Sequence, residues 1–173
     1  AHQVVYLPGD SDLNEGFATV VEEVGLERWL RTRGSDRLLD SWRTQRGRHR
    51  QFIALLLQTR ERLKELYATT LPDEEMRSRK QTEFGLLKLE YEKLKQQWDG
   101  YSGYDAWFSR TLNNAHLVTA ATYHGCLPGL RRVLTSVNGD LQKFYVEMRH
   151  LAGDERSAER TALCRATGVT GHE

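Results

Sequence analysis

Leu71-Pro72-Asp73 separates two long stretches, residues 36–69 and 73–98, whose apolar residues recur at helical spacing. In the second stretch the spacings are four, three and four, at Leu87, Tyr91, Leu94 and Trp98. Such spacing places the apolar side chains on one face of an α-helix, and proline suits the first turn of a new helix. Two long helices joined by a short turn pack antiparallel. The sequence therefore predicts an antiparallel helical hairpin over about residues 36–98.

Helical patterns continue on both sides of this hairpin. Upstream, residues 1–6 are predicted to end a helix, and a second helix is predicted from Leu13 to about Arg33, capped by Ser11 or Asp12. Downstream helices are predicted at 115–124, from 127 to about 137, and from Asp140 as a cap to Leu151, with a weaker one up to Arg165. No segment is predicted as a strand, so the predicted fold class is all-α. The predicted division is one domain over residues 1–152, followed by a polar tail over 153–173.

Composition and charge narrow the class of protein. The chain has 173 residues, of which 39% are hydrophobic and 28% charged, as in a folded globular protein. Lys plus Arg total 25 and Asp plus Glu total 24, so no nucleic-acid partner is expected. The most basic segment, residues 43–50, is expected to be the solvated face of a long helix because Asp40 and Glu61 lie nearby in the sequence.

Other sequence signals limit what can be inferred about location. No stretch approaches the roughly 20 apolar residues of a membrane-spanning helix, so none is expected in this chain. Cys126 and Cys164 allow one disulfide, but two cysteines do not fix the redox compartment. The chain opens on Ala1-His2-Gln3 without a Met, and no leader is visible.

His2 and Glu15 are the candidate metal ligands. Zinc peptidases of one large class carry two histidines in the helical motif H-E-x-x-H, with a carboxylate ligand on a following helix. The four-residue spacing puts both imidazoles on one face, and the glutamate between them acts as general base. Glu15 follows His2 by 13 positions, with a turn between them, so its carboxylate can swing back toward the imidazole.

The segments around these residues carry a family resemblance. Ala1-His2-Gln3, followed by Asn14-Glu15-Gly16-Phe17-Ala18, resembles the pattern H-E-L-A-H-Q … N-E-G-F-A of gluzincin aminopeptidases. Further on, the segments Tyr104–Phe108, Leu112–Ala115 and Thr122–His124 are similar to a narrower group, the bacterial putative aminopeptidase family. The resemblance spans roughly residues 1–152.

The resemblance implies a function and a ligand set. His2 would be the second histidine ligand of a Zn²⁺ ion and Glu15 its carboxylate ligand, with Asn14 beside the ligands or structural. Peptides would be the substrates, hydrolysed by metal-activated water. The first histidine and the general-base glutamate would then precede Ala1, so this chain would be an inactive C-terminal fragment of a zinc-peptidase catalytic domain. The family also implies the bacterial cell envelope, on the periplasmic side, with a lipid anchor as one option.

Such an enzyme also needs a donor to the oxyanion of the tetrahedral intermediate. Tyr123 is the first candidate and Tyr104 the second. The alternatives are a half-buried aromatic on a helix for Tyr123 and a loop aromatic packed on the hairpin for Tyr104. Asn114 could line the cleft, or either Asn113 or Asn114 could cap a helix.

Two other functions stay open. The hairpin over residues 36–98 could make the chain a non-catalytic helical interaction module, whose binding would be indifferent to chelators and to His2→Ala. A pseudoenzyme would keep the fold without the catalytic base. Neither the peptide specificity nor the oligomeric state follows from the sequence.

Overall fold

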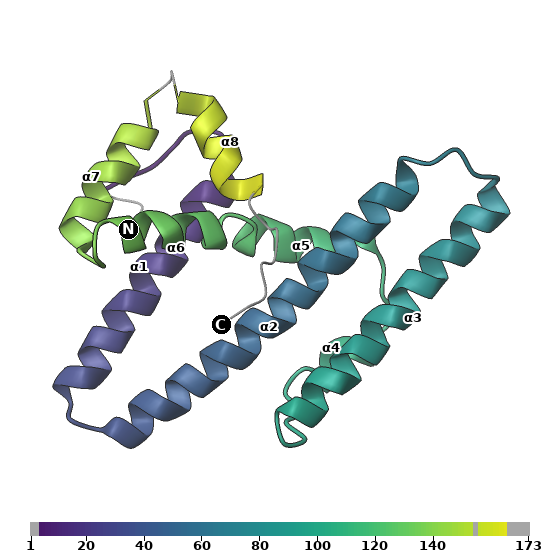
Figure 1. The fold of residues 1–173 in the computed structure, drawn as a ribbon, viewed down its shortest axis with the longest axis horizontal. Helices are drawn as coiled ribbons and strands as arrows, with labels where there is room; N and C mark the ends of the chain where they lie inside the picture. Colours follow the sequence, from purple (N-terminus) through teal and green to yellow (C-terminus); the bar gives the residue numbers. More distant parts are fainter. Residues whose placement is uncertain (1–3, 154–155, 166–173) are drawn as a thin grey trace. The chain divides into compact units, whose positions relative to one another are not determined.

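The computed structural model describes residues 4–153 and 156–165, apart from the side chains of residues 120–123 and 165 (Figure 1). Within those ranges the chain forms helices and no strand, which confirms the all-α prediction. The helices are α1 Ser11–Thr32, α2 Asp36–Tyr67, α3 Asp73–Gln97, α4 Asp105–Phe108, α5 Asn114–His124, α6 Leu127–Ser136, α7 Leu141–Leu151 and α8 Ser157–Arg165. The chain divides into two compact units. We call Ala1–Leu39 with Ala121–Glu173 the terminal unit, and Asp40–Ala120 the hairpin unit.

The core of the terminal unit lies between α1, α6, α7 and α8. From α1 it receives Leu13, Phe17 and Val20, each nearly or fully buried. The Phe17 ring lies 5.5 Å from Phe144 and 5.3 Å from Tyr145 of α7. These α1 side chains are spaced four and three apart, so the helical period alone directs them to one face.

The segment before α1 is extended, and the prediction that residues 1–6 end a helix is wrong for residues 4–6. Val5 and Leu7 are 3% and 4% exposed, whereas Val4 and Tyr6 are 55% and 61% exposed. This alternation has the two-residue period of extended chain. Asp10 caps α1, accepting a hydrogen bond from the Leu13 amide at 3.2 Å, in place of the predicted Ser11 or Asp12.

A disulfide joins Cys126, just before α6, to Cys164 of α8. It holds part of the predicted polar tail on the core, where Leu163 and Cys164 pack. The approach is close, because a Cβ on Gly129 would collide with the Leu163 backbone.

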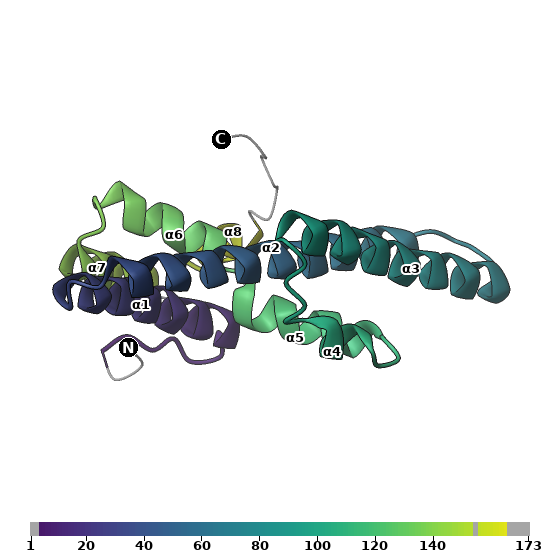
Figure 2. The same ribbon diagram turned by 90° about the horizontal axis from the view of Figure 1, so that it is seen from below.

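The hairpin unit is built on α2 and α3, which run side by side in opposite directions (Figure 1). Their interface buries Phe52, Leu56 and Leu63 of α2 with Leu87 and Tyr91 of α3. The predicted hairpin is therefore present, with helix ends within two residues of the predicted ones. The view from below shows α4 and the first turns of α5 on one side of the plane of these two helices (Figure 2).

A charged network also crosses the hairpin. Arg62 of α2 donates to Glu83 at 2.7 Å and to Glu90 at 3.1 Å, both on α3. All three side chains are about one-quarter exposed, so solvent screens these ion pairs only in part. The network thus turns the two α3 carboxylates toward α2.

The connection from α3 to α4 folds back onto the hairpin. Asp99 and Gly100 have positive φ angles of 55° and 81°, which let the chain reverse after Trp98. Arg48 of α2 donates to the Trp98 carbonyl at 3.3 Å and lies over the Tyr101 ring. This member of the basic segment 43–50 therefore covers an aromatic residue, whereas the sequence predicted a solvated face.

No helix in the described part of the chain is long and apolar enough to cross a membrane.

Candidate active site around Glu15

Glu15 lies in the first turn and a half of α1, within the segment Asn14–Ala18. Its side chain is half-buried, while Asn14 and Gly16 on either side are buried. Thr19 donates its hydroxyl to the Glu15 carbonyl at 2.9 Å, so the helix is regular here. The carboxylate thus starts from a rigid helical turn at the edge of the core.

Asn14 fixes the extended segment that precedes the helix. Its side-chain Oδ1 accepts from the Leu7 amide at 2.9 Å, and its Nδ2 donates to the Leu7 carbonyl at 2.8 Å. Both bonds are buried, and Asn14 is 3% exposed. A side-chain amide is one of the few groups able to satisfy a donor and an acceptor of one peptide residue together. Asn14 therefore ties Leu7, in the segment before α1, to the start of that helix.

Gly16 and Phe17 are required by packing. A Cβ on Gly16 would lie 2.9 Å from Leu130 Cδ1 and 3.4 Å from Cys126 Cβ, so α6 approaches α1 at this point. Phe17 is fully buried. Asn14, Gly16 and Phe17 thus have structural roles on either side of Glu15.

The other candidate residues are in the hairpin unit or outside the described residues. Tyr104 stacks on Phe52 at a centroid distance of 4.0 Å, and its hydroxyl lies 3.3 Å from His49 Nδ1. Burial raises the pKa of Tyr104, which keeps its hydroxyl protonated. This packing matches the alternative in which Tyr104 is a loop aromatic on the hairpin. His2 lies outside the described residues, and Tyr123 is on α5 with its side chain outside them.

Asn113 and Asn114 have different roles at the start of α5. Asn113 is the cap, because its Oδ1 accepts from the Ala115 amide at 3.0 Å. Asn114 instead exchanges hydrogen bonds with the Tyr67 hydroxyl of α2 at 3.1 and 3.2 Å. Asn114 and Tyr67 line a largely apolar pocket of about 410 Å³, together with Leu63, Leu117 and Val118. Asn114 therefore borders a cleft of the hairpin unit.

The donor set for a metal is incomplete among the described residues. No three His, Cys, Asp or Glu side chains in that part of the chain come together as a metal would need. Glu15 supplies the type of oxygen ligand that zinc accepts, but a catalytic zinc site needs three protein ligands. A metal at Glu15 would therefore need donors beyond the described residues, of which His2 is one.

Glu23, further along α1, pairs with a residue that is far from it in the sequence. Arg131 of α6 donates to both of its carboxylate oxygens at 3.0 and 2.9 Å. Glu23 therefore ties α1 to α6, and no helix-face pattern could have paired residues 108 positions apart.

The fold and the Glu15 segment define an all-helical protein with a carboxylate set at the start of a core helix. A family model described as "Putative aminopeptidase" matches residues 1–163, and the chain belongs to that family. Neither a curated protein nor a solved structure matches it.

Proposed function

We propose that this chain carries part of the catalytic site of a zinc-dependent aminopeptidase of the gluzincin type, with Glu15 and His2 as metal ligands. The observation that carries the proposal is the Asn14–Phe17 segment. Asn14, Gly16 and Phe17 are fixed by packing and hydrogen bonds, and among them they hold a half-buried glutamate near the start of α1. Family membership supports peptides as the substrate class.

The candidate residues would have different roles in this site. Glu15 would hold the metal through its carboxylate, and Asn14 ties Leu7 of the preceding segment to α1. A zinc ion bound here would supply a Lewis acid that activates water. Tyr123 is the first candidate to donate a hydrogen bond to the oxyanion, and Tyr104 the second. The general base and a further histidine are not assigned to residues of this chain.

The cell envelope is the proposed location. The Cys126–Cys164 disulfide supports it, because disulfides persist in the bacterial periplasm and are rare in the cytosol.

The test measures zinc content and aminopeptidase activity of the full-length protein. We expect about one zinc per chain, hydrolysis of aminoacyl-coumarin amides, and loss of both in Glu15→Ala. Glu147→Gln is the matched control, since Glu147 is an exposed carboxylate on α7 of the same unit. Full zinc content and activity in Glu15→Ala would refute the ligand assignment. Zinc binding without hydrolysis would favour a pseudoenzyme, and absence of zinc would favour an interaction module.

A further inference from the structure

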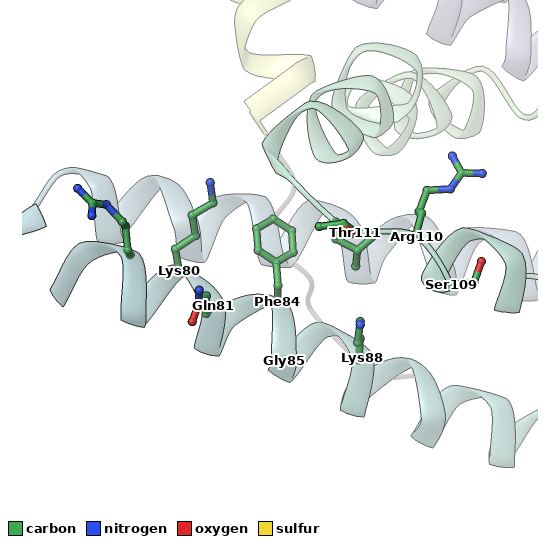
Figure 3. A pocket seen from close by; sticks show the side chains of 10 residues that line it. Lys80, Gln81, Phe84, Gly85, Lys88, Ser109, Arg110 and Thr111 are labelled. Atoms are coloured by element: carbon green, nitrogen blue, oxygen red, sulfur yellow. The ribbon is translucent and has the colours of Figure 1, made fainter. Parts of the chain in front are cut away.

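A second pocket lies in the hairpin unit, between α3 and the segment that follows α4 (Figure 3). Its volume is about 640 Å³. Phe84 projects from α3 between Lys80 and Lys88, and Arg110 belongs to the opposite segment (Figure 3). The pocket combines an aromatic floor with a basic rim.

Every charged side chain that lines this pocket is a cation. The four are Arg77, Lys80, Lys88 and Arg110. Among the described residues, Lys80, Lys88 and Arg110 form no ion pair with a carboxylate. Arg77 meets only Asp73, at 3.5 Å and with both side chains largely exposed. The concentration of positive charge is local, because Lys plus Arg exceed Asp plus Glu by one in the whole chain (25 against 24).

The acidic residues of α3 explain how the charges separate. Glu83 and Glu90 alternate with the lysines along the sequence, but both are held by Arg62 on the α2 side. Glu75 is paired with Arg79 at 2.7 Å. Arg77, Lys80 and Lys88 therefore line the pocket without a glutamate of α3 beside them in its lining. A cleft lined by one sign of charge concentrates ligands of the opposite sign.

The spacing of the cations indicates the shape of the ligand. Arg77 and Lys88 are 11 positions apart on one helix, which corresponds to about 16 Å at the usual rise. Charges spread over that length match about five residues of extended peptide, whereas a single phosphate needs donors that converge on one point. Gln81, Ser109 and Thr111 add neutral donors and acceptors suited to a peptide backbone.

We infer that this pocket binds an acidic peptide segment, with carboxylates on the basic rim and an apolar side chain against Phe84. The inference does not depend on the proposed peptidase activity. It describes a binding surface in the hairpin unit that would select partners or substrates carrying such a segment.

The test is fluorescence anisotropy of the protein with a labelled peptide of about five residues that alternates Glu and Leu. We expect binding that weakens as salt rises and that is lost with the matching Gln–Leu peptide. The double variant Lys88→Glu/Arg110→Glu should weaken binding by about tenfold or more. Lys93→Glu is the matched control, because Lys93 is an exposed lysine of α3 that does not line the pocket. Circular dichroism checks that each variant is folded.

Three outcomes would overturn the inference. The first is equal affinity for the Glu and Gln peptides. The second is the same loss in Lys93→Glu as in the double variant. The third is binding to phosphatidylglycerol vesicles, lost in the double variant, with no binding of the acidic peptide, which would assign the pocket to lipid headgroups instead.

Discussion

Replacing Asn14 with Ala should destabilise the terminal unit more than any exposed asparagine substitution. The change removes both hydrogen bonds to Leu7, at 2.9 and 2.8 Å. It leaves the buried Leu7 amide without this partner, whereas the Leu7 carbonyl still accepts from the Asp10 amide at 3.2 Å. The unpaired amide costs about 1–3 kcal/mol and the lost second bond to the carbonyl about 0.5–1.5 kcal/mol, so the expected loss in free energy of unfolding is about 1.5–4.5 kcal/mol. Asn113→Ala is the control, since Asn113 makes a single exposed cap bond, whose loss costs about 1 kcal/mol.

Urea denaturation followed by circular dichroism measures the two losses, and hydrogen exchange locates the first. The Leu7 amide should exchange faster in Asn14→Ala by a larger factor than amides in the hairpin unit. The prediction is refuted if Asn14→Ala loses no more free energy of unfolding than Asn113→Ala and the Leu7 amide keeps its protection from hydrogen exchange. That result would show that the extended segment is held by Val5 and Leu7 burial and not by the asparagine.

Two further predictions concern a covalent and an electrostatic link. Cys126 and Cys164 are 38 positions apart, so reduction of their disulfide should lower the free energy of unfolding by about 4 kcal/mol by the chain-entropy relation. Urea midpoints with and without reductant measure this loss, and an unchanged midpoint contradicts it. The pKa of Asp105 is held below its usual value by hydrogen bonds from Lys95 and then Tyr91, so this link stabilises the fold above about pH 4 and is lost as pH falls through the lowered pKa. Asp105→Asn should therefore reduce stability at neutral pH and flatten the acid limb of the stability profile, and an unaltered acid limb would argue against the link.

Helix positions followed from the sequence because they depend on local periodicity. The hairpin over α2 and α3 and its Pro72 turn were predicted close to their observed ends. Asp140 was predicted as a cap and accepts from the Gln142 and Lys143 amides. Both features depend on residues within a few positions of one another.

The same reasoning failed where a long-range contact determines the backbone. Residues 4–6 were predicted as helix, yet they are extended because alternate side chains enter the core. Trp29, an apolar residue within the predicted helix from Leu13 to about Arg33, is half exposed beneath the Arg33 guanidinium and not buried. Neither outcome can be read from a helical period, because each depends on which neighbour covers the position.

The sequence alone determined the helical class, the hairpin and the choice of Glu15 as the candidate ligand, which it identified by family resemblance. Only the tertiary structure showed why the neighbours of Glu15 are what they are. Asn14 satisfies the backbone of Leu7, and Gly16 admits Leu130. The tertiary structure also showed that Glu83 and Glu90 of α3 bind Arg62 of α2, whereas Lys80 and Lys88 of α3 line a pocket. The reason is the same in each case: burial and pairing depend on distances through space, and a sequence specifies only distances along the chain.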